Sequence, residues 1–261
     1  MQTILFPGFN IKLNISKIAI SIFNIDIYWY AIIIVFAIAL AIYISKKYDG
    51  KFSIRYEQIL DVVIFAIPVA LVFARLYYVM FNVYEFKSIL EILYLRSGGL
   101  AIYGALIGGF IASVLYCKKN KINILDLIDY IAPVVALAQS IGRLGNFINI
   151  EAYGRVTQLP WRMGIIEQGK YIEVHPTFLY ESIVTFLTFI LLTKLSKNRK
   201  FRGEITYIYI VIYSFARIFI ENLRTDSLMF YNVKISMIVS IVLFVAFSVI
   251  LIYQKIKTRK K

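Results

Sequence analysis

Long, uninterrupted runs of apolar residues dominate the chain. Each of seven runs approaches the roughly 20 residues that an α-helix needs to cross the hydrocarbon core of a bilayer, and the first contains no charged residue. The pattern therefore predicts an all-α, polytopic membrane protein with about seven transmembrane helices. The predicted spans cover residues 28–44, 59–80, 98–116, 124–144, 177–195, 206–223 and 233–253.

Two segments outside the runs are long. Residues 1–26, in which isoleucines alternate with polar residues, are expected to form short interfacial helices and lack the cleavage site of a signal peptide. Residues 146–176 contain Tyr153, Trp161 and Tyr171, which favour order at a membrane interface. No internal repeat is evident. Residues 1–261 are therefore predicted to form one transmembrane domain with an external N-terminal segment and an external head region.

The chain carries a formal net charge of +14, and the positions of its cations indicate what that charge does. More than half of the 29 lysines and arginines lie in four clusters, which follow the first, third and fifth spans and end the chain. Because cationic loops stay in the cytoplasm, the N-terminus is predicted outside and the C-terminus in the cytoplasm. The clusters then contact anionic lipids of the bilayer, and no nucleic-acid partner is expected.

Charged side chains inside the spans are costly and usually functional. Asp61 and Asp126 lie near predicted cytoplasmic ends and are expected to be solvated. Five others fall in the outer halves of spans that run in opposite directions, which predicts one shared outward-facing polar site: Arg75, Arg143, Glu181, Arg217 and Glu221. Arg217 and Glu221 are four residues apart and can pair on one helix face, a pairing that would also ease insertion alone.

The stretch from Gly142 to Arg155 reads GRLGNFINIEAYGR and lies where the fourth span ends outside. The planar guanidinium of Arg143 can bind a phosphate through two parallel hydrogen bonds. Three glycines allow close approach of the backbone or sharp turns. Further donors and acceptors come from Asn146, Asn149 and Glu151. The residues alone thus predict a protein that handles phospholipid head groups.

The same stretch resembles the signature G-R-x-G-N-F-x-N-x-E-x-x-G of the bacterial prolipoprotein diacylglyceryl transferase family. Every fixed position is matched between Gly142 and Gly154. The likeness covers most of the chain, because other segments resemble further landmarks in the family's order. These are Trp29-Tyr30, Gly98-Gly99 to Gly108-Gly109, His175-Pro176-Thr177 with Tyr180-Glu181, and Tyr213 to Arg217 with Glu221.

The resemblance implies a multi-pass enzyme of the bacterial plasma membrane. Such enzymes transfer the diacylglyceryl group of phosphatidylglycerol to the lipobox cysteine thiol of a prolipoprotein signal peptide. A thioether forms and glycerol phosphate is released, and no metal or organic cofactor is expected. The predicted transmembrane domain, residues 1–261, would then be the catalytic domain.

Roles carry over from the resemblance residue by residue. Arg143 would bind the phosphate of phosphatidylglycerol, and Arg217 would hold or activate the reacting head group. Displacing a phosphate-linked leaving group needs mainly positioning and charge stabilisation, which two arginines supply. The other implied residues shape the site: Asn146 and Gly154 form the phosphate pocket, Glu151 and Glu221 orient the arginines, and Tyr30 and Tyr213 line it.

The third span departs from the family's pattern, because Tyr103 stands where relatives often have a histidine. Tyrosine, with a reference pKa near 10, is a poor general base at neutral pH. Either Tyr103 donates a hydrogen bond or another group deprotonates the thiol. His175 is expected to cap a helix or face solvent, and Glu181 to partner an arginine. The candidate catalytic residues are therefore Arg143, Arg217, Tyr103 and Glu221.

Two other classes of protein fit part of the pattern. A membrane transporter also places charges inside its spans, but its site lies near the bilayer midplane between internal repeats. A scaffold or assembly factor would tolerate the loss of any single arginine. The alternative to the enzyme is therefore a membrane transporter or another phospholipid-binding membrane protein with an outward-facing site for an anionic ligand. Thioether formation distinguishes the enzyme from both.

Overall fold

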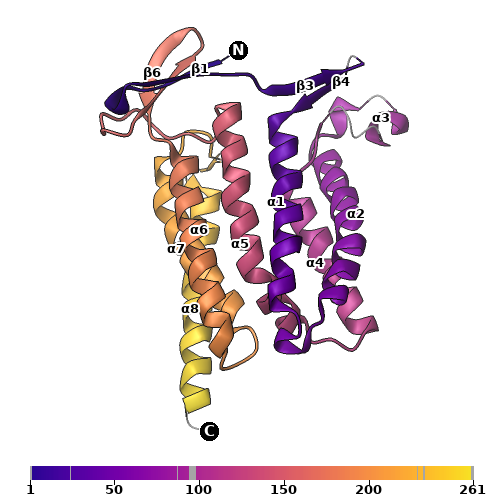
Figure 1. Cartoon of the computed structure of the whole chain (residues 1–261). Coiled ribbons are helices and arrows are strands. Elements are labelled where there is room, and N and C mark those ends of the chain that lie inside the picture. The colour runs from indigo at the N-terminus through magenta and orange to yellow at the C-terminus, as the bar shows by residue number, and fades with distance from the viewer. Residues whose placement is uncertain are drawn as a thin grey trace. The chain divides into compact units, whose positions relative to one another are not determined.

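A computed structural model describes residues 2–23, 25–86, 88–93, 98–227, 229–231 and 233–259. Helices dominate this part of the chain (Figure 1), and six of them are long and apolar enough to cross a membrane by length and composition. The mostly helical, polytopic architecture is thereby confirmed. The six are α1 (Trp29–Ser45), α2 (Tyr56–Phe81), α4 (Ile102–Lys119), α5 (Ile124–Asn149), α6 (Thr177–Leu195) and α8 (Ile235–Arg259).

The other two helices differ from these six. Helix α7 (Glu204–Leu223) is continuous over 20 residues, but its apolar sequence contains Arg217 and Glu221, which lower its hydropathy. Helix α3 (Ile89–Leu93) is a short piece between α2 and α4. Helix α5 continues five residues beyond the predicted end of the fourth span, so Asn146 and Asn149 lie on its last turn and not in a loop.

Strands occupy the N-terminal segment, where helices were expected. That expectation was wrong, because isoleucine alternating with polar residues, as in Ile11–Ile15, has the two-residue period of a half-buried strand. The all-α description was correspondingly too narrow. The four strands are β1 (Gln2–Phe6), β2 (Ile11–Ile15), β3 (Ile18–Ile22) and β4 (Ile25–Tyr28).

A four-stranded antiparallel sheet joins the N-terminal segment to the predicted head region. Strands β5 (Met163–Glu167) and β6 (Lys170–Val174) extend the β1–β2 hairpin in the order β2-β1-β5-β6. Apolar residues of the sheet pack on Phe178 in the first turn of α6; the buried ones are Ile4, Met163, Ile165 and Val174. The sheet thus rests on the helix end that follows His175. A further small hairpin, β7 (Met229–Phe230) with β8 (Val233–Lys234), precedes α8.

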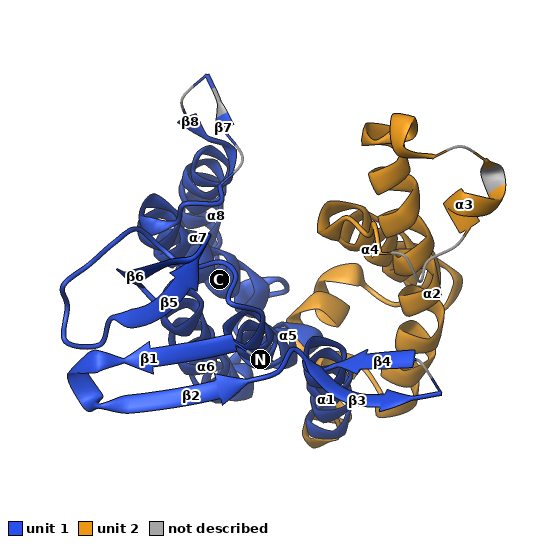
Figure 2. Cartoon of the chain, turned by 90° about the horizontal axis from the view of Figure 1, so that it is seen from above, with its two compact units in different colours: residues 1–45, 131–261 blue, residues 46–130 orange. Residues whose placement is uncertain are grey.

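The chain divides into two compact units, residues 1–45 with 131–261 and residues 46–130 (Figure 2). In the second unit α4 packs closely on α2. A Cβ atom on Gly104 would lie 2.3 Å from the carbonyl oxygen of Phe73, and one on Gly108 would lie 2.6 Å from the Cβ of Phe73. Small residues four apart allow such close helix packing in membranes.

Two aspartates of the second unit test the expectation of solvated carboxylates. Asp61 is exposed and accepts a hydrogen bond from Tyr116, as expected. Asp126 is only 5% exposed, so the expectation was wrong there. It lies in the first turn of α5, where the positive end of the helix dipole favours a carboxylate.

In the first unit, α5 is held to α1 and to α6 by close contacts. A Cβ atom on Gly145 would lie 2.5 Å from the ring of Tyr30, so this glycine lets the tyrosine pack directly on the α5 backbone. On the α6 side, Ser140 Oγ donates to the Ser182 carbonyl at 2.8 Å, and Ser182 Oγ donates back to the Ser140 carbonyl at 2.9 Å. These contacts fix the end of α5 that carries Arg143.

Candidate functional site

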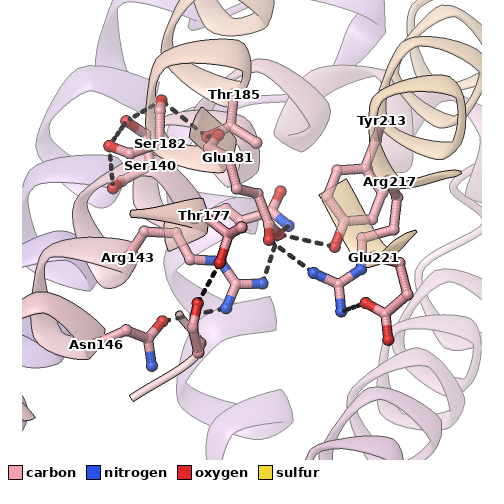
Figure 3. A network of polar contacts seen from close by, with 12 residues as sticks. Ser140, Arg143, Asn146, Thr177, Glu181, Ser182, Thr185, Tyr213, Arg217 and Glu221 are labelled. Atoms are coloured by element: carbon pink, nitrogen blue, oxygen red, sulfur yellow. Dashed lines mark hydrogen bonds and ion pairs between the residues drawn. The ribbon is translucent and has the colours of Figure 1, made fainter. Parts of the chain in front are cut away.

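Four charged residues meet between three helices of the first unit (Figure 3). Helix α5 contributes Arg143, α6 contributes Glu181, and α7 contributes Arg217 and Glu221. Glu181 is 3% exposed and Glu221 1% exposed, so both carboxylates are withdrawn from solvent. We refer to Arg143, Glu181, Arg217 and Glu221 as the charge cluster.

Glu181 binds both arginines of the charge cluster. Its Oε1 pairs with Arg143 Nη2, and its Oε2 accepts from Arg217 Nη1 at 2.7 Å. Tyr213 also donates to Oε1, at 3.0 Å. A buried carboxylate is costly unless it is paired and fully hydrogen-bonded, and Glu181 meets both conditions. The expected role of Glu181 as an arginine partner is confirmed, with two arginines in place of one.

The predicted pair within α7 is also confirmed. Arg217 Nη2 lies 2.6 Å from Glu221 Oε2. The contact is an ion pair without hydrogen-bond alignment, because this Oε2 atom has no hydrogen-bond partner. Arg217 therefore lies between two buried carboxylates, and the formal charges of the cluster cancel. This cancellation explains how apolar helices accommodate two arginines.

The polar residues of the signature extend the cluster toward the end of α5. Arg143 Nη1 donates to Asn146 Oδ1 at 3.1 Å. Asn146 in turn donates to Glu151 Oε1 at 2.8 Å, and Asn149 donates to the same oxygen at 3.3 Å. Glu151 is thus connected to Arg143 through the amide of Asn146.

Two polar residues next to Glu181, Gln139 and Tyr209, were not predicted from the sequence. Tyr209 donates to Gln139 Oε1 at 2.7 Å, and Gln139 Nε2 lies 3.5 Å from Glu181 Oε1. Gln139 precedes Arg143 by one helical turn on α5, so it shares a face with that arginine. This spacing was the signal in the sequence that could have identified it.

Gly154 lies where the loop after α5 touches the start of α6 and the end of α7. Its N–H donates to the His175 carbonyl at 2.8 Å, and the next residue, Arg155, donates to the Leu223 carbonyl at 2.8 Å. A Cβ atom on Gly154 would lie 2.9 Å from His175 Cβ, Leu223 O and Thr177 Cγ2. Only a glycine fits here, because three elements converge on its α-carbon.

His175 neither caps α6 nor stands free in solvent. Pro176 is the N-cap of that helix, and the His175 ring is half-buried against Tyr180, whose hydroxyl lies 3.2 Å from Nδ1. Burial, together with the positive charge of Arg155, lowers the pKa of the imidazole. The Tyr180 hydroxyl also accepts from Trp161 Nε1 at 2.7 Å, so the ring belongs to a small polar chain on the loop.

Arg224, just past the end of α7, is a further cation that the sequence reasoning missed. Burial opposes its charged form, but the hydrogen bond and charge of Asp226, followed by the charges of Glu221 and Glu181, hold its pKa above the ordinary value. The two bonds to Asp226 measure 2.8 and 2.9 Å. Arg224 thus adds positive potential close to the charge cluster.

Two predicted residues belong to the second unit. Arg75 is 5% exposed and donates to backbone carbonyls there, at Glu91, Ile92, Gly98 and Gly99. Four of the five charges expected at one site meet within the first unit. Within the second unit, Arg75 binds carbonyls of α3 and of the two glycines Gly98 and Gly99. Tyr103 is 45% exposed, with its ring centroid 6.4 Å from that of Tyr77.

The helices and the charge cluster define a helical membrane protein in which two arginines share one buried carboxylate. Within the described residues no group of three or more His, Cys, Asp or Glu side chains could hold a metal ion. The family model of prolipoprotein diacylglyceryl transferase matches residues 17–253. The chain belongs to the prolipoprotein diacylglyceryl transferase family.

Curated relatives match this chain over most of their own length. A phosphatidylglycerol–prolipoprotein diacylglyceryl transferase of Finegoldia magna is 45% identical over 233 residues, which cover 88% of this chain and 92% of the relative. Proteins of the same name from Clostridioides difficile and Clostridium novyi are 44% and 40% identical, over 87% and 94% of this chain and 90% and 98% of their own lengths.

Proposed function

We propose that this protein transfers the diacylglyceryl group of phosphatidylglycerol to the lipobox cysteine thiol of prolipoproteins in the bacterial plasma membrane. The family model and relatives at 40–45% identity support this activity. Among the features of the chain, the observation that carries the proposal is the pairing of Arg143 and Arg217 on the single carboxylate of Glu181.

The reaction exchanges one bond to carbon for another. The cysteine sulfur forms a bond to the glyceryl carbon that carries the phosphate ester, and the carbon–oxygen bond to that phosphate breaks. Glycerol phosphate leaves with the electron pair, and the thiol proton passes to a base or to the product phosphate. Negative charge grows on the leaving phosphate, so donors fixed in advance around it lower the barrier.

The two arginines are placed to supply those donors. Each guanidinium has five N–H donors, and within the described residues Arg143 uses one for Glu181 and one for Asn146. Its side chain remains 21% exposed, and that of Arg217 13% exposed. We assign Arg143 to the phosphate of the lipid and Arg217 to the reacting head group, with Glu221 orienting Arg217.

The remaining site residues act around this pair in our proposal. Asn146 holds Arg143, and Glu151 holds Asn146 through the hydrogen bonds described above. Gly154 keeps the loop tight enough to close the phosphate pocket. Tyr213 lines it beside Glu181, and Tyr30 lines it from α1. Tyr103 remains a candidate hydrogen-bond donor, because no assigned residue is a conventional base.

We further propose that α7 is a seventh span, which sets the orientation. Its 20 residues extend about 30 Å at 1.5 Å per residue, enough for the hydrocarbon core. Seven spans place the two termini on opposite sides of the membrane, and the cationic clusters then put the N-terminus outside and the C-terminus in the cytoplasm. Residues 1–26 and the head region, 146–176, would lie on the outer face. Residues 1–261 would form one catalytic domain that meets exported substrates from the outside.

A lipobox peptide and phosphatidylglycerol test donor, acceptor and reaction together. The purified protein should form the thioether, detected by mass spectrometry, only when phosphatidylglycerol is supplied. The Arg143→Ala variant should lose nearly all of this activity. Arg162→Ala, which removes the arginine that precedes β5 and pairs with Glu173, is the matched control. Undiminished thioether formation by Arg143→Ala would contradict the role assigned to Arg143. Absence of thioether formation by the wild-type protein would favour a phospholipid-binding or transport protein instead.

A further inference from the structure

A pocket of about 500 Å³ lies in the first unit, beside the Gly142–Gly154 signature. Its wall is formed by residues of β1, the end of α5 and the following loop, and the end of β5 with the turn after it. These residues are Gln2, Thr3, Lys17, Asn149, Ile150, Tyr153, Ile165, Ile166, Glu167 and Gln168. The volume falls in the range of pockets that bind small molecules or short peptide segments. None of the roles proposed above uses this pocket.

The pocket forms where two strands of the sheet diverge. Strands β1 and β5 pair at Leu5 and Gly164, and their ladder has no further pair over the described residues of these two strands. Beyond this pair, Gln2 and Thr3 lie across the pocket from Ile166 and its neighbours. Unpaired strand backbone is a template for an added extended segment. The shape of the pocket therefore suits a polypeptide in an extended conformation.

The lining mixes polar side chains with isoleucines and carries little net charge. Lys17 is its only cation and Glu167 its only carboxylate, and Glu167 already accepts a hydrogen bond from Tyr153. Gln2 Oε1 is buried and has no hydrogen-bond partner. A buried amide oxygen of this kind needs a hydrogen-bond donor, and the backbone N–H groups of a peptide supply one. A single lysine, offset by Glu167, offers little positive charge for a phosphate, so the lining favours a peptide over an anionic lipid head group.

Hydrogen bonds connect the pocket to the charge cluster. Asn149, in the pocket wall, donates to Glu151, which accepts from Asn146, which in turn accepts from Arg143. An occupant of the pocket would thus lie a few side chains from the arginine assigned to the phosphate. Apart from Asn149, the last residue of α5, the wall consists of strands and loops and not of spanning helices.

We propose that this pocket binds the extended segment that follows the lipobox cysteine of the acceptor polypeptide. The inference rests on the proposed transferase function and adds a binding site for the exported part of the acceptor. The membrane-embedded helix of the signal peptide would approach between the spans, and the residues after the cysteine would lie along β1 and β5. Binding there would hold the thiol near Arg143 and Arg217.

Two acceptor peptides distinguish peptide binding in this pocket from the transfer reaction itself. One ends at the cysteine amide, and the other continues for about eight residues, roughly 26 Å when extended. Both are assayed with the full-length protein and phosphatidylglycerol in micelles. The wild-type protein should show a lower KM for the longer peptide at a similar kcat. If neither peptide forms a thioether, the proposed function itself fails.

Variants at two exposed positions localise the effect. Ile166→Asp alters the pocket wall, and Val156→Asp alters a position outside it; their native side chains are 62% and 67% exposed, so both variants should fold. Ile166→Asp should raise the KM of the longer peptide roughly tenfold without changing the kcat for that peptide. The KM of phosphatidylglycerol and the KM of the short peptide should also stay unchanged. Val156→Asp should change none of these.

Two results would overturn the proposal. One is an equal wild-type KM for both peptides, because the added segment would then gain no contact. The other is an Ile166→Asp variant that either leaves the longer peptide's KM unchanged or changes the KM of phosphatidylglycerol. Gln2→Leu, which removes the buried amide at similar size, should reproduce the effect of Ile166→Asp more weakly.

Discussion

Arg217 donates to Glu181 at 2.7 Å across 36 residues of sequence, and this bond ties α7 to α6 in the middle of the charge cluster. The second oxygen of the same carboxyl binds Arg143 from α5. One carboxylate therefore sets the spacing of both guanidinium groups before any substrate arrives. Donors that are already oriented need no reorganisation during the reaction, which is how fixed dipoles accelerate it.

The first prediction concerns this shared carboxylate. Glu181→Gln leaves two buried arginines with one carboxylate fewer, and breaking a buried ion pair costs about 3–5 kcal/mol. We expect the variant to unfold at a clearly lower temperature and to lose at least about a hundredfold in kcat/KM, about 2.7 kcal/mol. Thermal unfolding in detergent and the transfer assay measure the two effects.

Glu173→Gln is the control for Glu181→Gln. Glu173 pairs with Arg162 on the sheet, where both side chains are about a quarter exposed. Exposed ion pairs contribute only about 0–1 kcal/mol, so this variant should keep both stability and activity. Equal losses in the two variants would contradict the special role of Glu181.

The second prediction separates charge from geometry at the arginines. Arg143→Lys and Arg217→Lys keep the positive charge but lose the planar, two-pronged arrangement of donors that fits a phosphate. We expect each variant to lose at least about tenfold in kcat/KM, about 1.4 kcal/mol. Arg162→Lys, just before β5, should remain near wild type. Full activity of Arg143→Lys would mean that a point charge is sufficient.

Much of the site could be predicted because its residues are anomalies in the sequence. Arg143 and Arg217 stand out in apolar helices, and the spacing of Arg217 and Glu221 predicts their pair. Gln139 and Tyr209 were not predicted, because an uncharged polar residue costs less free energy inside a span than a charged one and is a weaker sign of a functional site. Their role depends on which helix faces turn toward Glu181, and only tertiary packing decides that.

The fold was predicted less completely than the site. The apolar runs located the long helices, because span length is fixed by bilayer thickness. The strand β1 was missed, since its partner β5 lies far along the chain and a short alternating segment is ambiguous without that partner. The end of α5 was missed because Asn146 and Asn149 look like loop residues, although in the structure their side chains are bound by Arg143 and Glu151.

The third prediction concerns Gly154. In Gly154→Ala the new Cβ would meet three groups at 2.9 Å, one of them the backbone oxygen of Leu223. The loop must shift, at a cost of about 1–3 kcal/mol, and we expect both a lower unfolding temperature and a higher KM for phosphatidylglycerol. Gly109→Ala is the control, because its Cβ would find only Ala70 Cβ at 3.7 Å. An unaffected Gly154→Ala variant would show that the loop is free to move.

The fourth prediction concerns Lys234, which closes the end of α7. Its ammonium donates to the carbonyls of Glu221, Asn222 and Arg224, at 2.7, 3.3 and 2.5 Å. A cation at a helix C-terminus stabilises the unpaired carbonyls there. Lys234→Met should reduce stability by about 1–3 kcal/mol and lower kcat by displacing Arg217, whereas Lys234→Arg should restore most of both. Failure of arginine to rescue the variant would indicate that packing matters more than charge.

The last prediction is a pH dependence that arises from His175. Burial and then Arg155 lower its pKa in the folded protein, whereas the unfolded chain has the ordinary value near 6.5. The folded state therefore binds the proton less readily, and the stability from neutral His175 is present above about pH 6.5 and is lost as pH falls through the folded-state pKa. Burial raises the pKa of Asp226, but Arg224 outweighs this effect and lowers it. Asp226 therefore changes the pH dependence of stability only below about pH 4. We expect the unfolding temperature of the wild type to drop as the pH falls below about 6.5, and His175→Asn to flatten this slope. A slope unchanged by His175→Asn would assign the titration to another group.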